Sequence, residues 1–188
     1  MLFRAWLSRG DRAPYGSFGN GSAMRVGPVG LAMNSIDDVL AEAERSAAAT
    51  HDHPEGIRGA QATALATFLA RTGHPKTAIR REIEQRFGYD LSRSLDDIRP
   101  GYEFDVTCQG SVPEAITAFL DSDGVESAVR LAISLGGDAD TQAAIAGGIA
   151  EAFHGGVPQE IETEVLARLP QEFRDVLTEF GRRFQAER

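Results

Sequence analysis

The sequence predicts an all-α protein, folded as an orthogonal multi-helix bundle. Apolar residues recur at three- and four-residue steps in several segments, which is the period of an amphipathic helix. Prolines and glycines separate these segments at the places where helices start and stop. No alternating run of valine and isoleucine is long enough for a strand, and no repeat is present. We expect the 188 residues to form a single domain over 1–188.

The first third of the chain predicts a glycine-rich loop followed by two helices. Residues 1–34 are predicted to be loop, with a short helical start at 2–7. The next helix begins after Ser35, whose side chain would cap it, and ends near Thr50. Pro54 suits the first turn of a helix, so a second helix is expected from Pro54 to about Arg71.

The remaining chain predicts further helices of ordinary length. Residues 91–108 are expected to be a polar connection that ends in an extended segment at 102–107. The last helix follows Pro170, and its apolar residues Phe173, Leu177, Phe180 and Phe184 are expected to form a buried stripe; these residues and Trp6 are assigned to core or interface. The other expected helices span about 75–87, 113–120, 125–135, 141–153 and 161–169.

Charge and composition exclude several classes of function. The chain has 19 Lys and Arg against 28 Asp and Glu, a formal net charge of −9, so binding to a nucleic-acid backbone is not expected. The best apolar run, 143–150, is far shorter than the ~20 residues of a membrane helix, and the N-terminus lacks the apolar core of a secretory signal. Cys108 is the single cysteine and cannot form an internal disulfide. A cytoplasmic location is therefore expected.

The segment from Gly136 to Thr141 is the most informative for chemistry. It places Asp138, Asp140 and the hydroxyl of Thr141 within four residues, directly before a helix of small residues. Such oxygen ligands suit Mg²⁺, Mn²⁺ or Ca²⁺ rather than zinc. The alternative is that one of the two acids only caps the helix. Capping uses one acid and leaves the second beside it at an electrostatic cost unless a cation is present.

Three other features have both a functional and a structural interpretation. The glycines around Asn20 and Ser22 could expose backbone N–H groups to an anion, or could form an ordinary turn. His51-Asp52 is similar to the metal centre of the all-α phosphohydrolases named for that pair, but those need an upstream histidine and His51 is the first in the chain. Cys108 is either a nucleophile or, as we prefer, a small buried hydrophobe.

Four segments occur in a characteristic order and spacing. They are 17–30 (SFGNGSAMRVGPVG), 50–54 (THDHP), 108–115 (CQGSVPEA) and 135–141 (LGGDADT) with 143–148 (AAIAGG). Together they resemble the ADP-ribosylglycohydrolase family, whose relatives include the dinitrogenase-reductase-activating glycohydrolases. The resemblance covers about 15–158, which is most of the chain.

This resemblance implies an all-α bundle of the ADP-ribosylglycohydrolase type and a hydrolase with two Mg²⁺ or Mn²⁺ ions. Such an enzyme cleaves the N- or O-glycosidic bond between ADP-ribose and a modified side chain. The implied substrate is an ADP-ribosylated protein or a small ADP-ribose derivative. Acids and metal-bound water can stabilise and trap the oxocarbenium-like transition state of this reaction.

The resemblance also implies the site residues. Asp138 and Asp140 are the implied catalytic residues, and with Thr141 they are the implied metal ligands. The substrate-binding positions comprise a loop around the diphosphate and ribose, a histidine beside the ligand and a group on the adenine side. These positions are Gly19, Asn20, Gly21, Ser22, Ala23, Met24, His51, Tyr102, Gly110, Ser111 and Val112.

The sequence departs from the family pattern before Tyr15. Family members carry an N-terminal Thr-Asp-Asp run, preceded by a Gly-Asp-Ala-x-Gly-type segment, that supplies the other half of the metal site. Asp11 stands alone beside two arginines, and Asp37-Asp38 follow the Gly-Asn-Gly motif instead of preceding it. We therefore expect an N-terminally truncated domain that matches the C-terminal two-thirds of the family domain.

This departure predicts an altered metal site and weaker activity. Two carboxylates and a hydroxyl would hold one weak ion or none, so catalysis is expected to be weakened or absent. Apolar faces that lack a partner would favour self-association. Two alternatives to the hydrolase follow: a non-catalytic ADP-ribose-binding module or pseudoenzyme, and a helical scaffold without ligand.

Overall fold

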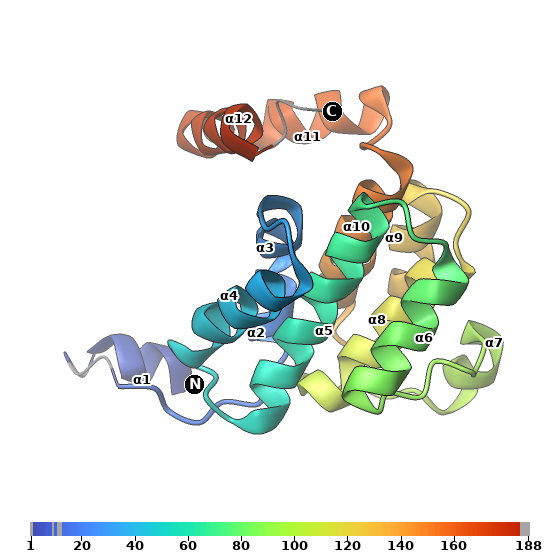
Figure 1. Ribbon diagram of the computed structural model, residues 1–188, viewed down its shortest axis with the longest axis horizontal. Coiled ribbons are helices and arrows are strands. Elements are labelled where there is room, and N and C mark those ends of the chain that lie inside the picture. The colour runs from blue at the N-terminus through green and yellow to red at the C-terminus, as the bar shows by residue number, and fades with distance from the viewer. Residues whose placement is uncertain (1, 9, 11–12, 185–188) are drawn as a thin grey trace.

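The computed structural model of the chain describes residues 2–8, 10 and 13–184, and Asp11 lies outside them with its neighbours Arg9 and Arg12. Helix α5 (Pro54–Arg71) runs through the middle of the molecule, between the helices of the first and second halves of the chain (Figure 1). Most of its residues from Gly56 to Ala70 are buried, and many are alanine or glycine. Small side chains on nearly every side let several neighbouring helices approach α5 closely.

The other helices surround α5 in an all-α arrangement, as the sequence predicted. Among the described residues no strand is present, and a single antiparallel bridge joins Gly19 to Thr107. No helix in the described ranges is long and apolar enough to cross a membrane. The helices are α1 (Leu2–Ser8), α2 (Gly21–Met24), α3 (Gly27–Ala32), α4 (Ile36–Ala48), α6 (Lys76–Phe87), α7 (Leu95–Ile98), the 3-10 helix η1 (Arg99–Gly101), α8 (Cys108–Asp121), α9 (Val125–Ser134), α10 (Ala139–His154), α11 (Gln159–Arg168) and α12 (Gln171–Phe184).

Several predicted helix ends are confirmed together with their physical causes. The Ser35 hydroxyl accepts a hydrogen bond from the Asp38 N–H at 3.1 Å and caps α4. Pro54 occupies the first turn of α5, where a missing N–H costs nothing. Gly88 ends α6 in the left-handed conformation, with φ of 70°.

The prediction that residues 13–34 form only loop is wrong, because α2 and α3 lie within them. The Asn20 carbonyl starts α2 by accepting hydrogen bonds from the Ala23 and Met24 N–H groups at 3.0 Å. Pro28 lies in the first turn of α3. The connection over 91–108 also contains a short helix, α7, whose start is stabilised by a capping box between Ser94 and Asp97.

Helix α8 begins at Cys108, five residues before the predicted start at Pro113. The Thr107 side chain accepts a hydrogen bond from the Gly110 N–H at 3.1 Å and fixes the earlier start. Pro113 lies inside the helix, where it removes one backbone donor. Nearly all of α8 is buried, so packing in the core outweighs this loss.

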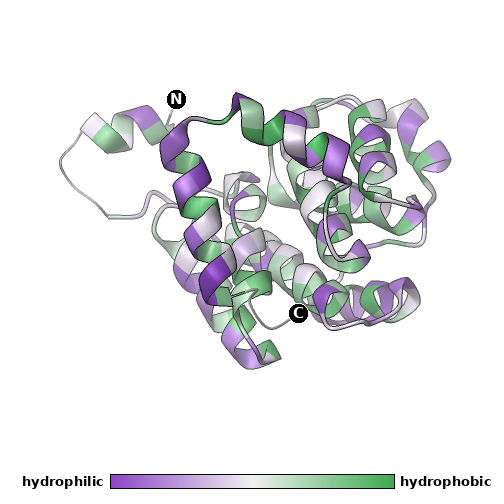
Figure 2. Ribbon diagram, turned by 90° about the horizontal axis from the view of Figure 1, so that it is seen from above, coloured by the Kyte–Doolittle hydropathy of each residue, from purple (hydrophilic) through white to green (hydrophobic). Residues whose placement is uncertain are grey.

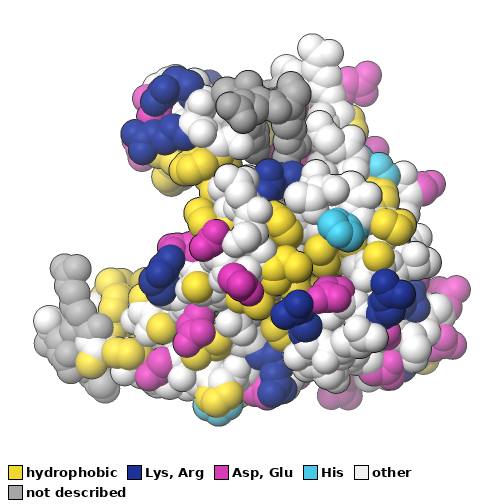
Figure 3. All heavy atoms as spheres, in the orientation of Figure 1, with side chains coloured by type: hydrophobic (Ala, Val, Ile, Leu, Met, Phe, Trp, Pro, Cys, Tyr) yellow, Lys and Arg dark blue, Asp and Glu magenta, His cyan; other side chains and the backbone are white. Residues whose placement is uncertain are grey.

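The apolar stripe of α12 is not buried, which contradicts the sequence prediction. Phe173, Leu177 and Phe184 are 54%, 52% and 45% exposed, and α11 and α12 contribute no buried residue. The two helices form an arm that extends beyond the bundle (Figure 1), and α12 alternates hydrophobic and hydrophilic residues (Figure 2). Figure 3 shows hydrophobic side chains along the α12 surface that overhangs the body. The predicted amphipathic pattern is present, but no described element covers the apolar face of α12.

The close approach of α5 and α8 generates a testable prediction at Gly59. A Cβ at this position would lie 2.5 Å from Cys108 Sγ and 2.7 Å from its Cβ. Gly59→Ala should lower the free energy of unfolding by about 1–3 kcal/mol, because the two helices must move apart. Urea denaturation measures this change.

Gly148→Ala is the matched control for that substitution. Gly148 also lies within a helix, α10, and a Cβ there would meet nothing within 4 Å. Its free energy of unfolding should stay equal or rise by up to about 1 kcal/mol. Equal losses in the two variants would contradict the importance of the α5–α8 contact.

Candidate functional site

The candidate site begins where the glycine-rich loop lies against the start of α8. The Asn20 N–H donates to the Val106 carbonyl at 2.8 Å, and the Cys108 N–H donates to the Phe18 carbonyl at 2.9 Å. These bonds flank the bridge between Gly19 and Thr107. The segment 102–107, predicted to be extended, therefore holds the loop that precedes α2 beside the first turn of α8.

Asn20 joins this region to the acidic segment before α10. Its side-chain Nδ2 donates to Asp138 Oδ2 at 2.7 Å and to Ser111 Oγ at 3.1 Å. Ser111 Oγ donates in turn to the Thr107 carbonyl at 2.6 Å. Asn20 is only 5% exposed, so these bonds lie largely out of water. One buried amide thus connects three of the four segments that the sequence singled out.

Asp138 and Asp140 lie at the first turn of α10. Asp138 occupies the N-cap position, but its side chain makes no capping hydrogen bond and is bound by Asn20 instead. Asp140 is exposed, and its Oδ1 accepts from the Thr141 N–H at 3.0 Å. Thr141 is buried, and its hydroxyl donates to Met24 Sδ at 3.6 Å. The Asp138 side chain therefore does not cap α10, and the assignment of its carboxylate to the site stays a prediction.

Tyr102 supports the turn before α10. Gly136 and Gly137 have φ of 79° and 66°, and a Cβ on Gly137 would lie 2.7 Å from Tyr102 Cε1. The Tyr102 hydroxyl donates to the Gly110 carbonyl at 3.0 Å and accepts from the side-chain amide of Gln142. Burial raises the pKa of the Tyr102 hydroxyl, so the phenol stays protonated.

His51 lies beside the glycine-rich loop, next to Gly19 and Gly21. Its side chain is 7% exposed, and a Cβ placed on Gly21 would come within 3.4 Å of His51 Nε2. Burial, together with the nearby Arg25 guanidinium, lowers the pKa of His51 to about 4. The ring is therefore uncharged at neutral pH.

Cys108 is a structural residue in this geometry. Its thiol donates to the Gly19 carbonyl at 3.1 Å and lies 3.5 Å from the Ser22 hydroxyl. Burial raises the pKa of the thiol to about 11, so hardly any thiolate exists at neutral pH. The interpretation of Cys108 as a small buried hydrophobe fits these observations, and a nucleophilic role does not.

The structure brings all the sequence-predicted site residues into one region. Ser22, Ala23, Ser111 and Val112 are fully buried, backbone and side chain alike, and their assignment as substrate-binding positions stays a prediction. Met24 and Asp140 are exposed. Sequence reasoning missed three residues that complete the hydrogen-bond network, namely Arg25, Thr50 and Gln142. The first two belong to motifs already recognised, whereas nothing in the pattern around Gln142 marked it.

The acidic pair offers the chemistry of a metal site with few ligands. In the described part of the chain no group of three His, Cys, Asp or Glu side chains is placed to hold a metal ion. Asp138, Asp140 and the Thr141 hydroxyl supply two carboxylates and one neutral oxygen. Neither carboxylate forms an ion pair with a lysine or arginine among the described residues. By the chemistry of its oxygens this donor set suits one hard divalent cation that keeps several waters, and its role as a metal site stays a prediction.

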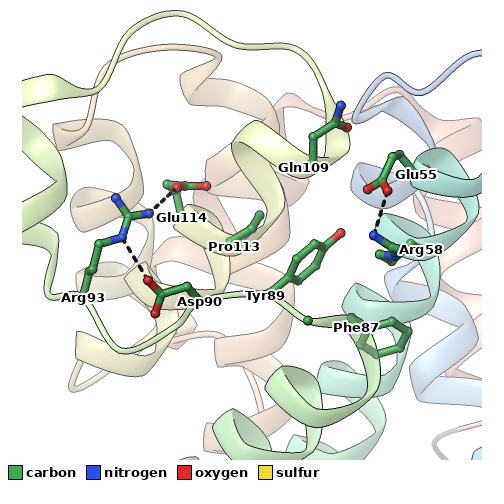
Figure 4. A pocket seen from close by; sticks show the side chains of 10 residues that line it. Glu55, Arg58, Phe87, Tyr89, Asp90, Arg93, Gln109, Pro113 and Glu114 are labelled. Carbon is green, nitrogen blue, oxygen red and sulfur yellow. Dashed lines mark hydrogen bonds and ion pairs between the residues drawn. The ribbon is translucent and has the colours of Figure 1, made fainter.

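A separate cavity of about 440 Å³ lies between the start of α5, the loop after α6 and the start of α8 (Figure 4). Its charged side chains neutralise one another: Arg58 pairs with Glu55 at 2.7 Å, and Arg93 pairs with Glu114 at 3.1 Å. None of the sequence-predicted site residues lines it. We therefore do not assign the candidate site to this cavity.

The sequence resemblance implied an all-helical bundle, and the structure has this architecture. The bundle places a glycine-rich loop beside a buried histidine and the acidic start of a helix. The chain belongs to the ADP-ribosylglycohydrolase family, because the sequence model of that family matches residues 1–188. A solved ADP-ribosylglycohydrolase-related protein complex has the same fold, with a TM-score of 0.64 and 32% identity, over 83% of this chain and 58% of that chain. The predicted fold class is confirmed.

Curated relatives agree with this assignment. ADP-ribosylhydrolase ARH3 of Bos taurus is 31% identical over 74% of this chain and 51% of its own length, and the Mus musculus protein is 32% identical over 74% and 50%. ADP-ribosylarginine hydrolase Tri1 of Pseudomonas putida (strain GB-1) is 30% identical over 84% of this chain and 46% of its own length. The chain spans about half the length of the curated relatives it matches.

The role of Asn20 generates a prediction about charge. Asn20→Asp would place a second carboxylate about 3 Å from Asp138 and remove the amide donor. The free energy of unfolding should fall by about 1–2 kcal/mol at pH 7. Repulsion raises the pKa values of the acid pair in the folded state above the unfolded value of about 4, so the loss should shrink as the pH falls through the raised values and disappear below about 4.

Urea denaturation at pH 7 and at acid pH tests this prediction, with Asn34→Asp as control. Asn34 is exposed before α4, so the same change there should have little effect at either pH. A loss at Asn20 that is independent of pH would contradict the proposed contact with an ionised Asp138.

The lowered pKa of His51 generates a prediction about the pH dependence of stability. Between the unfolded value near 6.5 and the folded value of about 4, the unfolded state binds more protons than the folded state. Stability should therefore fall as the pH falls through this range. His51→Asn should reduce this slope in urea denaturation measured at pH 7, 5.5 and 4.

His154→Asn is the matched control for His51→Asn. His154 is exposed at the end of α10, so its removal should leave the slope nearly unchanged. If the two variants reduced the slope equally, burial of a neutral His51 would not be its cause.

Proposed function

We propose that this chain is an ADP-ribosyl hydrolase whose activity is weakened by its small set of metal ligands. The reaction is cleavage of the N- or O-glycosidic bond between ADP-ribose and a modified side chain, with assistance from Mg²⁺ or Mn²⁺. The observation that carries the proposal is the 2.7 Å hydrogen bond between Asn20 and Asp138, which ties the glycine-rich loop to the acidic helix start. The names of the relatives, ADP-ribosylhydrolase and ADP-ribosylarginine hydrolase, support the substrate class.

The glycine-rich loop supplies the contacts for the diphosphate and ribose. Gly19 and Gly21 leave open backbone beside His51. The N–H group of the half-buried Gly21 has no backbone hydrogen-bond partner outside α2 within the described ranges, and it is a donor of the kind that binds phosphate oxygens. The formal charge of −9 does not oppose this contact, because backbone dipoles act at short range. The substrate is an ADP-ribosylated protein or a small ADP-ribose derivative.

Asp138, Asp140 and Thr141 would hold the divalent ion where the start of α10 lies against the glycine-rich loop. Such an ion, when bound, would supply positive charge and would lower the pKa of a bound water. Asn20 keeps one oxygen of Asp138 in a fixed direction, and Thr141 is held by its own burial and by Met24. The two carboxylates also stabilise positive charge that develops on the ribose when the bond breaks.

A non-catalytic ADP-ribose-binding module, or pseudoenzyme, is the second candidate function. It is favoured by the small donor set, since two carboxylates and one hydroxyl suit a single weakly held ion. In that case the glycine-rich loop and His51 would bind the ligand without turnover. The self-association and cytoplasmic location expected from the sequence stay predictions under either candidate.

The deciding experiment measures ADP-ribose binding and ADP-ribose release with the purified chain. Release is assayed on a panel of ADP-ribosylated proteins with Mg²⁺ and with EDTA, and binding of free ADP-ribose is measured by calorimetry. Asp138→Asn should lower any Mg²⁺-dependent release by about 100-fold or more, because one of two charged ligands is lost. The control Glu44→Gln removes an exposed carboxylate on α4 and should leave release unchanged.

The outcomes separate the two candidates. Metal-dependent release supports the hydrolase, and binding without release supports the binding module. If Asp138→Asn leaves release unchanged, the metal assignment is wrong. A folded chain that neither binds nor releases ADP-ribose would overturn both functions.

A further inference from the structure

A chain of hydrogen bonds leads from Arg25 through Thr50 to His51. Arg25 Nη2 donates to Thr50 Oγ1 at 3.1 Å, and Thr50 Oγ1 lies 2.7 Å from His51 Nδ1. Arg25 follows α2, and Thr50 and His51 follow α4. The same guanidinium donates to the carbonyls of Gly21 at 3.2 Å and Ser46 at 3.1 Å, so its position is fixed from both sides.

The donors and acceptors of these hydrogen bonds determine where the protons of Thr50 and His51 lie. A guanidinium has only donors, so Thr50 Oγ1 must be the acceptor in its bond with Arg25. The hydroxyl carries one proton, and within the described chain its one other hydrogen-bond neighbour is His51 Nδ1. If Nδ1 carried a proton instead, the hydroxyl proton would have no acceptor there. The arrangement that satisfies every group has Thr50 donating to an unprotonated Nδ1.

An unprotonated Nδ1 leaves the proton of the neutral ring on Nε2. The lowered pKa of His51, about 4, agrees with a neutral ring. Nε2 faces the glycine-rich loop: a Cβ added to Gly21 would lie 3.4 Å from Nε2, and a Cβ on Gly19 would lie 3.7 Å from it. The Nε2 atom therefore lies beside the two loop glycines, at the part of the loop that would face a ligand under the proposed function.

We infer that Arg25 and Thr50 are positioning residues that hold His51 as the neutral Nε2–H tautomer, so that this N–H donates a hydrogen bond to an acceptor oxygen of the ligand. The ligand step rests on the proposed function, in which the oxygen belongs to the phosphate or ribose of ADP-ribose. An uncharged donor keeps its proton across the physiological pH range. Because Arg25 also binds the Gly21 carbonyl, one side chain sets both the loop and the ring that faces it.

The tautomer can be tested without any ligand. In the full chain labelled with ¹⁵N-histidine, NMR distinguishes protonated from unprotonated ring nitrogens, and His51→Asn identifies the signals of His51. We expect an unprotonated Nδ1 and a protonated Nε2 at pH 7. Observation of the opposite tautomer would overturn the inference.

Thr50→Val and Thr50→Ser form the matched pair of variants. Valine has nearly the shape of threonine without the hydroxyl, so His51 should shift toward a mixture of tautomers, whereas serine keeps the hydroxyl and should restore the wild-type signals. Circular dichroism checks that each variant folds. If Thr50→Val does not fold, Arg25→Gln replaces it, since loss of the guanidinium frees Thr50 to accept from Nδ1–H. An unchanged tautomer of His51 in the folded variant would contradict the positioning role of Arg25 and Thr50.

Calorimetry with ADP-ribose tests the ligand step. The dissociation constant should rise about ten-fold in Thr50→Val and stay within about three-fold of wild type in Thr50→Ser, as expected for one weakened hydrogen bond. An unchanged dissociation constant in a variant whose tautomer has shifted would overturn the donor role of His51. If the tautomer is as expected but the wild type does not bind ADP-ribose, the proposed function fails while the assignment of the proton stands.

Discussion

The side-chain amide of Asn20 is the interaction on which the candidate site depends. It donates to Asp138 and to Ser111 from a position that is almost completely buried. Both acceptors would otherwise lose a partner in a region with little water, which costs more than the hydrogen bond itself contributes. The loop before α2, the start of α8 and the start of α10 therefore hold one relative position.

The bundle supplies the rigid frame for this amide. Helix α5 has small residues where α8 crosses it, and Gly59 lets Cys108 come into direct contact. Because Cys108 starts α8 and its N–H binds the Phe18 carbonyl, the packing of the core also fixes the edge of the glycine-rich loop. The thiol, which carries no charge here, contributes through its volume and its hydrogen bond to Gly19.

Much of the helical frame could be predicted from the sequence, since its signals are local. The cap at Ser35, Pro54 at the start of α5 and Gly88 after α6 each act within a few residues. The start of α8 was misplaced, because the Thr107 cap competes with the stronger pattern signal of Pro113. The stripe of α12 was assigned to core or interface and expected to be buried, because an amphipathic pattern indicates an apolar face but not what covers it.

The site was predicted less completely, for a different reason. Resemblance of ordered motifs named Asp138, Asp140, Thr141 and the glycine-rich loop, but the bond from Asn20 to Asp138 joins residues 118 positions apart and follows only from the tertiary fold. Gln142, which donates to the Tyr102 hydroxyl, is a single polar residue in a helix and has no sequence pattern of its own. The role of such a supporting residue can be recognised only when the tertiary structure shows which group it hydrogen-bonds.

The wide separation of Asn20 and Asp138 along the chain also has a kinetic consequence. Contacts that close a loop of this length form only after most of the chain has ordered, because the entropy of closure must first be offset by packing. During synthesis the glycine-rich loop emerges long before α10, and until then its amide at Asn20 has no carboxylate to bind. A ligand that contacts both the glycine-rich loop and the start of α10 therefore binds the completed domain and not an unfinished one. By mass action such a ligand stabilises the completed form alone.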